Sequence, residues 1–200
     1  MKENILHKAT ELFLNLGFKS VTMDDIANEM GISKKTIYAN YATKTKLVEA
    51  STNYLFDSIN YGIECIRERK DNPIEELYKI KQFVMEHLKG EKTSPQYQLQ
   101  KYYPKMFANL KSKHLVMMED CVIDNLERGI DQGLFRKEIP IEFIFRIYFA
   151  GVVSIKDQEI FPELKFTKKS LMENHLEYHL RGICTPKGLE IMHDLINQNE

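Results

Sequence analysis

The stretch from Thr22 to Leu47 constrains the fold more than any other, because it predicts two short helices joined by a tight turn. Thr22 can cap the first helix, with Asp25 three residues on as the acidic partner of a capping box. Gly31 falls where that helix must stop, since the residue after a helix end often needs positive φ. Ser33 is placed to cap the second helix. The sequence therefore predicts a helix-turn-helix.

The second helix of this pair, from Lys34 to about Tyr41, carries mostly hydrogen-bonding side chains around the apolar Ile37. Between Met30 and Val48 the chain has four lysines and no acid, and such a local positive charge favours a polyanion. An exposed helix also has the size that fits the major groove of DNA. The same pattern occurs in all-α proteins with an ordinary solvated face, so spacing and charge leave DNA binding and a purely structural role open.

Motif residues recur at fixed offsets through about the first 48 residues. They are Ala9, Leu12, Phe13, Gly17, Phe18, Val21, Thr22, Asp25, Ile26, Ala27, Gly31, Ile32, Ser33, Thr36, Ile37, Tyr38, Tyr41 and Lys44. In this order and spacing they resemble the DNA-binding domain of the TetR family of bacterial transcriptional regulators. Lys35 departs from the pattern, because many members carry a small residue there, and it bears on base preference. The resemblance covers about a quarter of the chain by motif, and the remainder only by helical architecture.

Eight residues are assigned to DNA contact by this resemblance. Those that match groove-facing or phosphate-facing positions on the second helix are Lys34, Lys35, Thr36, Tyr38 and Asn40, and those that match positions holding the DNA backbone are Ser33, Tyr41 and Lys44. Hydroxyls, helix N-termini and lysines suit phosphate oxygens, which fix register without reading sequence. Two roles stay open, since Tyr38 can pack on a thymine methyl or a sugar and Tyr41 can be a packing residue beneath the domain.

The whole chain is predicted to be all-α, in two domains. Residues 1–47, with a first helix over residues 2–16, form the three-helix DNA-binding domain, and by resemblance residues 48–200 form a helical effector-binding and dimerisation domain. The helices expected beyond residue 47 cover 47–70, 73–89, a segment near 97–107 interrupted by Pro104, 112–132, 139–160, 167–184 and a last helix after Pro186. No proline or glycine cluster separates Tyr41 from Tyr54, so helix 47–70 should form a stiff connection between the two domains.

The segment 139–160 is apolar around most of its circumference, and a helix of that kind must be buried on every side. In a protein of this size, one way to bury the second face is against another subunit, with Gly151 allowing a close approach. The segment 167–184 is its natural partner, and the two resemble the pair that forms a four-helix dimer interface in TetR-like proteins. The expected interface residues are Ile144, Ile147, Tyr148, Gly151, Val152, Ile155, Leu171, His175, Leu176, His179, Leu180 and Ile183.

Helices between residues 47 and 132 supply aromatic and sulfur side chains of the kind that line adaptable small-molecule pockets. The candidates are Tyr61, Phe83, Tyr97, Tyr103, Phe107, His114, Met117, Met118 and Cys121, and the same residues can instead be ordinary core. By resemblance, a ligand in this cavity would displace helix 47–70 and move the two recognition helices of a dimer away from a groove separation of about 34 Å. Only a ligand with different affinities for the two states can do so.

Composition argues against several other classes. The three cysteines, Cys65, Cys121 and Cys184, have no CxxC spacing, so neither a disulfide framework nor a zinc site is expected, and a reducing cytoplasm is the simplest setting. His175 and His179 lack a convincing third metal ligand, and no catalytic set is recognisable. The longest uncharged run in the most apolar region, residues 147–155, is too short to span a bilayer. Acidic residues near the N-terminus argue against a secretory signal.

The charge is distributed unevenly although the totals nearly balance, at 28 basic and 29 acidic residues. Residues 1–47 carry seven lysines and five acids, and a small positive domain on an acidic remainder is compatible with DNA binding. The sequence thus predicts a cytoplasmic, homodimeric, TetR-like repressor, without cofactor, metal or catalysis. It would bind a palindromic double-stranded DNA operator and release it when a small, largely apolar effector occupies the second domain.

Two other interpretations stand beside this one. The first is a helical ligand-binding or protein-interaction module that no longer reads DNA, and the second is an enzyme that uses the cavity of the second domain. The lysines between Met30 and Val48 and Tyr38 argue against the module, because a domain freed from DNA would have no physical need for them.

Overall fold

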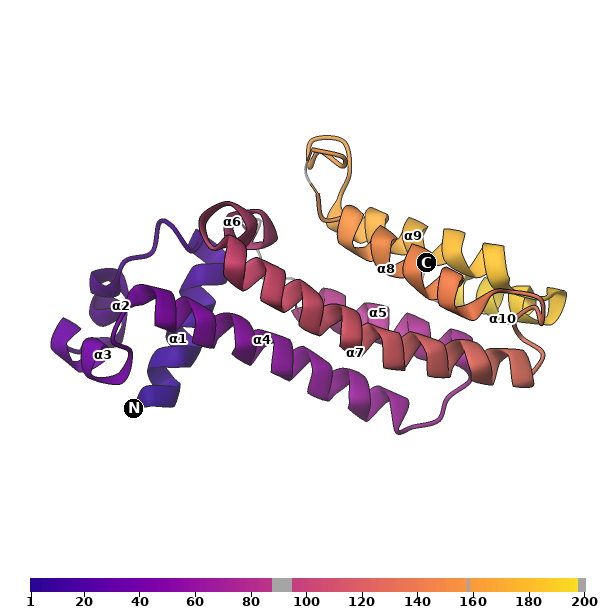
Figure 1. The fold of residues 1–200 in the computed structure, drawn as a ribbon, viewed down its shortest axis with the longest axis horizontal. Coiled ribbons are helices and arrows are strands. Elements are labelled where there is room, and N and C mark those ends of the chain that lie inside the picture. The colour runs from indigo at the N-terminus through magenta and orange to yellow at the C-terminus, as the bar shows by residue number, and fades with distance from the viewer. Residues whose placement is uncertain (88–94, 158, 198–200) are drawn as a thin grey trace. The chain divides into compact units, whose positions relative to one another are not determined.

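The computed structural model describes residues 1–87, 95–157 and 159–197, and within them the fold is all α-helical, as predicted (Figure 1). The helices are α1 (Lys2–Leu16), α2 (Met23–Met30), α3 (Lys34–Asn40), α4 (Lys44–Arg67), α5 (Pro73–His87), α6 (Pro95–Tyr102), α7 (Pro104–Asp131), α8 (Ile141–Ser154), α9 (Lys168–Ile183) and α10 (Pro186–Asn197). The one extended feature in this part of the chain is an isolated bridge between Phe135 and Cys184. No described helix is both long and apolar enough to cross a membrane.

Three helix boundaries differ from those predicted. Helix α4 begins at Lys44 because the Thr43 hydroxyl accepts the Lys46 N–H and caps it. Pro104 interrupts the segment near 97–107 as predicted, but α7 begins there and not near residue 112, since proline lacks only an N–H that a first turn leaves unpaired. Helix α8 ends at Ser154, well before residue 160, where turns follow. The end expected for α5 near residue 89 lies outside the described residues.

The chain divides into two compact units. The head unit comprises Met1–Tyr61 and His87–Lys111, and the body unit comprises Gly62–Glu86 and Ser112–Glu200. Helices α4 and α7 each contribute residues to both units. The domain boundary expected after residue 47 stays a prediction.

The core of the head unit lies among α1, α2, α3 and the start of α4. Helical spacing places Ile5, Ala9 and Phe13 on one side of α1, where all three are fully buried. Ile26 of α2, Ile37 of α3 and Leu47 of α4 meet them and are equally inaccessible. Part of α6 and of α7 joins this core, through the buried Leu99 and the half-buried Tyr103, Met106, Phe107 and Leu110.

The body unit has its own core, formed by α5, α7, α8, α9 and α10. The fully buried members include Ile74, Leu126, Phe135, Phe145, Leu180, Ile183 and Met192. A Cβ on Gly129 would collide with the ring of Phe135, so only glycine lets that ring pack against α7. This core fixes the helices that carry the predicted dimer residues.

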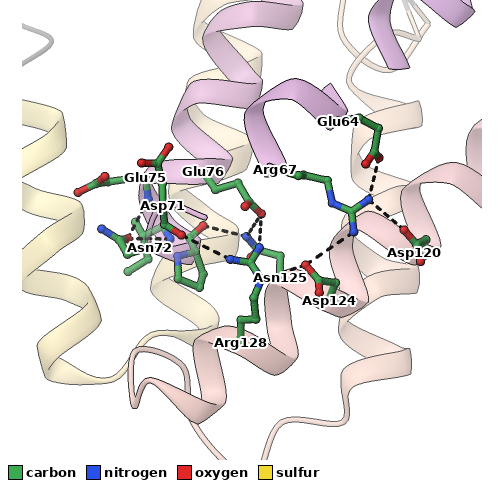
Figure 2. Close-up of polar contacts among 12 residues, drawn as sticks. Glu64, Arg67, Asp71, Asn72, Glu75, Glu76, Asp120, Asp124, Asn125 and Arg128 are labelled. Atoms are coloured by element: carbon green, nitrogen blue, oxygen red, sulfur yellow. Dashed lines mark hydrogen bonds and ion pairs between the residues drawn. The ribbon is translucent and has the colours of Figure 1, made fainter. Parts of the chain in front are cut away.

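A polar network joins the end of α4 to α5 and α7 within the body unit (Figure 2). Glu76 is completely buried, and its Oε1 accepts from Arg128 Nη2 at 2.6 Å and from Asn125 Nδ2 at 2.8 Å. Arg67 Nη1 donates to Asp120 Oδ2 at 2.9 Å. Buried charges are tolerated where partners of this kind surround them, so the network fixes the register of the three helices.

Candidate nucleic-acid interface

The predicted caps of the helix-turn-helix are all present. The Thr22 hydroxyl accepts the Asp25 N–H at 3.1 Å, while Asp25 Oδ2 accepts the Thr22 N–H at 2.8 Å, which completes the capping box. These bonds from the Thr22 backbone and hydroxyl hold the pKa of the Asp25 carboxyl below its ordinary value. Gly31 is left-handed, at φ 63°, and Ser33 accepts the Thr36 N–H at the start of α3. Local chemistry therefore sets where α3 begins.

Helix α3 is anchored on one side and open on the other. Ile37 is fully buried in the head core, whereas Lys34 and Lys35 are exposed and Tyr38 is 43% exposed. A helix held by a single buried side chain presents its remaining faces to a partner. The arrangement fits a helix that enters a major groove.

Several of the predicted contact residues already have partners in the head unit. Lys34 Nζ lies 2.6 Å from Asp24 Oδ2 of α2, and this bond raises the pKa of the lysine. Asn40 Nδ2 donates to the Thr36 carbonyl at 2.8 Å. Lys35 and Tyr38 are therefore the side chains of α3 that the structure leaves most directed outward. The sequence pattern did not indicate Asp24 as a partner of Lys34, because Asp24 precedes the acid-free stretch between Met30 and Val48 in which Lys34 lies.

Tyr41 and Lys44 lie between the end of α3 and the start of α4 in the head unit. Tyr41 is only 7% exposed, and its hydroxyl donates to the Lys2 carbonyl at 3.4 Å, which favours the packing role that the sequence left open. Burial raises the pKa of this hydroxyl. Lys44 is half-buried, and its Nζ donates to the Lys19 carbonyl at 3.1 Å. Burial lowers the pKa of the Lys44 ammonium group, and the Asp25 carboxylate opposes that effect.

Residues 5–51 match the family model described as bacterial regulatory proteins, tetR family. The match covers α1, α2, α3 and the start of α4, including the capped turn and the outward face of α3. Over these residues the chain is similar to the TetR family. The resemblance seen in the motif residues is thereby confirmed.

Curated relatives of this chain are regulators with a helix-turn-helix. It is 28% identical over 112 residues to the biofilm operon icaADBC negative transcriptional regulator IcaR of Staphylococcus aureus (strain Newman). That alignment covers 56% of this chain and 54% of IcaR, so the chain spans about half the length of that relative. The uncharacterized transcriptional regulator YvaF of Bacillus subtilis (strain 168) is 25% identical over 186 residues, which cover 92% of this chain and 95% of YvaF.

Solved structures extend the likeness in fold to most of the chain. A TetR-family transcriptional regulator from Agrobacterium tumefaciens superposes with a TM-score of 0.74 at 18% identity, covering 92% of this chain and 97% of that one. A transcriptional regulator from Cytophaga hutchinsonii ATCC 33406 gives 0.67 at 21% identity, covering 92% and 98%. The all-α fold of TetR-family proteins therefore describes this chain beyond the family-model match.

The residues predicted for an effector cavity are divided between the two units of the chain. Tyr103 and Phe107 pack against the head core, and Tyr61, at 74% exposed, and Tyr97, at 43%, are solvent-accessible. The remaining members, Phe83, His114, Met117, Met118 and Cys121, belong to the body unit. Burial raises the pKa of the Cys121 thiol to about 12, so this sulfur behaves as an apolar group. Their role in ligand binding stays a prediction.

An open hollow of about 350 Å³ lies between α4 and α5 in the body unit. Its lining residues are Gly62, Cys65, Ile66, Arg69, Lys79, Gln82 and Phe83, so Phe83 is the only predicted effector residue among them. The close approach of the Phe83 ring to Gly62 explains why α4 carries a glycine there. Two cationic side chains make this hollow more polar than the predicted cavity.

The predicted dimer residues on α8 and α9 fall into two groups. Leu176, Leu180 and Ile183 are buried in the core of their own body unit. By contrast, Ile147 is 53% exposed. Two residues that the sequence pattern did not single out are also exposed, Phe143 at 58% and Tyr178 at 78%. We call these three exposed residues the outer face of α8 and α9, and their burial by a second subunit stays a prediction.

An aromatic cluster holds α8 against α9. The Tyr148 ring stacks on His175 at 5.2 Å and meets His179 at 4.4 Å between centroids. A Cβ on Gly151 would collide with the His175 ring, so the close approach expected of Gly151 is made to its own subunit. Burial lowers the pKa of His179 to about 4. Among the described residues no group of three or more His, Cys, Asp or Glu could hold a metal ion.

Proposed function

We propose that this chain is a sequence-specific DNA-binding regulator that uses α3 to read an operator. The observation that carries this proposal is the geometry of α3, which is capped at Ser33, anchored by Ile37 and open at Lys35 and Tyr38. A lysine can donate to guanine acceptors in the major groove, and a tyrosine can pack on a thymine methyl. Ser33 and Lys44 supply donors for phosphate oxygens. Lys34, Thr36 and Asn40 are further proposed contacts to the groove or to the phosphates.

The regulator acts as a homodimer on a palindromic operator. Two copies of α3 must be held about one helical turn, or about 34 Å, apart to read two half-sites. The outer face of α8 and α9 supports an isologous interface, because Phe143, Ile147 and Tyr178 are large and exposed. The predicted interface positions that are buried, such as Leu180, act by supporting this face from behind.

Repression relieved by a small molecule is the mode of action we propose. Repression follows the likeness to IcaR, which is described as a negative transcriptional regulator. An effector bound in the body unit would shift the dimer between a form that fits DNA and one that does not, provided its affinity differs between them. The function needs no catalytic step and no cofactor, and its place is the cytoplasm, where the bacterial chromosome lies.

Selection of bound duplexes from a random DNA pool tests the function directly. We expect enrichment of an inverted repeat whose half-sites are about one helical turn apart. If only salt-sensitive background binding remains, α3 is not a sequence reader, and the chain is better described as a ligand-binding or protein-interaction module. Sedimentation of the free protein at micromolar concentration should give a dimer, and a monomer would contradict the proposed interface.

A further inference from the structure

We propose that the phosphate-binding surface of the head unit continues over α6, so that the protein also holds the duplex that flanks each operator half-site. The ligand is the sugar-phosphate backbone of double-stranded DNA, bound without regard to sequence. This inference rests on the proposed function and extends it to a surface that lies outside the helix-turn-helix.

The first support is the charge of the chain around α6. Residues 92–118 contain five lysines and no aspartate or glutamate. Three of these lysines, Lys101, Lys105 and Lys111, lie in the head unit on α6 and the first turns of α7, and all three are exposed. A lysine-rich stretch without acids creates a local positive potential next to the DNA-binding domain. The near-neutral total charge of the chain does not reveal this local potential.

The second support is the way the cations follow one another across the head unit. Lys44 Nζ donates to the carbonyl of Lys19, and Lys19 Nζ in turn lies 4.9 Å from the centre of the Tyr102 ring. Lys101 Nζ lies 5.7 Å from the same ring, and it also donates to the Tyr97 hydroxyl at 3.2 Å. Lys44, a predicted phosphate ligand, therefore contacts the backbone of Lys19, and the Lys19 and Lys101 ammonium groups both lie near the Tyr102 ring of α6. We call Lys19, Tyr97, Lys101 and Tyr102 the α6 patch.

The α6 patch is a fixed part of the head unit. Figure 1 shows α6 beside the connection between α1 and α2, and the Gln98 Oε1 accepts the Lys19 N–H of that connection at 3.3 Å. The Gln98 side chain packs so closely on Gly17 that a Cβ there would collide with it. Leu99 on the same helix is 4% exposed within the head core. A surface anchored in this way keeps its position relative to α3 when the protein binds DNA.

The side chains of the α6 patch have the chemistry that DNA backbones require. Tyr97 and Tyr102 are 43% and 39% exposed and carry hydroxyl donors, which suit phosphate oxygens as lysine ammonium groups do. Cation–π contacts at an exposed surface are weak, so the two lysines can exchange an aromatic ring for a phosphate. None of these side chains needs to reach a base edge, and the contact would therefore add affinity without adding sequence preference.

Binding to two duplexes tests the inference. One is the minimal selected operator, and the other carries the same operator with about ten further base pairs of arbitrary sequence on each side. The variant is Lys19→Ala/Lys101→Ala, and the matched control is Lys137→Ala/Lys169→Ala, two exposed lysines of the body unit. Circular dichroism and thermal unfolding check that both variants are folded.

For the native protein we expect tighter binding to the extended duplex than to the minimal one. The Lys19→Ala/Lys101→Ala variant should lose about tenfold in affinity for the extended duplex, with a salt-dependence slope lower by about two, because two phosphate contacts are removed. Its affinity for the minimal operator should stay within about twofold of native, and the control should match the native protein on both duplexes.

Three results would overturn the inference while leaving the proposed function intact. The first is equal native affinity for the two duplexes, the second is an unchanged salt slope in the Lys19→Ala/Lys101→Ala variant, and the third is an equal loss on both duplexes. Failure of the proposed function has a different signature, because then no operator is enriched from the random pool at all. An equal loss on both duplexes would place the two lysines inside the operator contact and would also contradict a flanking role.

Discussion

The ammonium group of Lys44 donates a hydrogen bond to the main-chain carbonyl of Lys19, 3.1 Å away. This bond ties the first residue of α4 to the connection between α1 and α2. Because Lys44 is half-buried, its ammonium group is held at one place on the surface and its side chain samples few other positions. The same residue therefore supports the head unit and, in the proposed function, would offer a positioned cation to a phosphate.

Replacing Lys44 should weaken DNA binding without changing its sequence preference. We expect Lys44→Ala to lower the affinity for all duplexes alike and to reduce the slope of affinity against salt by about one, since one phosphate contact is lost. Fluorescence anisotropy at several salt concentrations measures both quantities. Lys44→Arg, which keeps the charge, is the control, and an altered base preference in Lys44→Ala would show that this residue reads bases.

Placing a charge on the outer face of α8 and α9 should dissociate the dimer. Ile147→Asp would bring two carboxylates into an apolar isologous interface, where unpaired charges are costly to bury. Sedimentation velocity at micromolar concentration should then report a monomer. Val116→Asp, at a position of α7 that is 68% exposed, is the matched control. A dimer that survives Ile147→Asp would mean that the subunits meet elsewhere.

The Glu76–Arg128 pair should contribute strongly to the stability of the body unit. Arg128→Ala leaves the completely buried Glu76 carboxylate without its arginine, and we expect a loss of about 3–5 kcal/mol in the free energy of unfolding. Adding Glu76→Gln should recover part of that loss, because the uncompensated charge is removed. Urea unfolding at pH 7 measures both.

A matched control for this pair exists on the surface of α8. Arg146 is 48% exposed and lies 2.7 Å from Glu142, in an ion pair of similar geometry. Arg146→Ala should cost less than about 1 kcal/mol, because water screens exposed ion pairs. Equal effects of the two arginine replacements would contradict the structural role given to the buried network.

Buried histidines should make the protein less stable in mild acid. Burial lowers the pKa of His114 and of His179 to about 4, and the unfolded chain has the ordinary value of about 6.5. Between these values the unfolded state binds the protons, so stability is full above about pH 6.5 and is lost as the pH falls towards 4. Each group can contribute a few kcal/mol across that window, on the order of 1.4 kcal/mol per pKa unit.

Thermal unfolding from pH 7 to pH 4.5 measures this effect. His179→Leu keeps an apolar group of similar size against Tyr148 and removes one proton site, so the unfolding temperature of this variant should fall less steeply with pH than the native one. His193→Gln, at an exposed position of α10, is the control. A variant profile parallel to the native one would contradict the assignment.

Local chemistry made the helix-turn-helix predictable from sequence. The Thr22–Asp25 capping box, the left-handed Gly31 and the Ser33 cap all depend on residues within four positions of each other, and each was found as predicted. The pairing of Lys34 with Asp24 across the turn was not anticipated, because the two residues lie on different helices. The distance between these two side chains depends on the angle at which α2 and α3 pack.

Long-range packing explains what the sequence did not predict in the rest of the chain. The sequence left Tyr103 and Phe107 open as pocket or core residues, and they pack against the head core, more than fifty residues away from α3 in sequence. On α8 and α9 the apolar pattern was compatible with several faces. It could not say that Leu180 would pack inside its own unit while Tyr178 stays exposed. Such choices depend on which neighbouring helices reach each face.

Comparing base preferences of the native protein with those of α3 variants tests the central claim most directly. Each protein would be used to select duplexes from the same random pool, with Lys35→Ala and Tyr38→Ala as variants and Lys46→Ala as a control on the exposed surface of α4. If α3 reads the operator, the native protein and the control enrich the same inverted repeat, while each α3 variant relaxes the preference at particular positions of both half-sites. The same enriched sequence from all four proteins, or none from the native protein, would contradict the account.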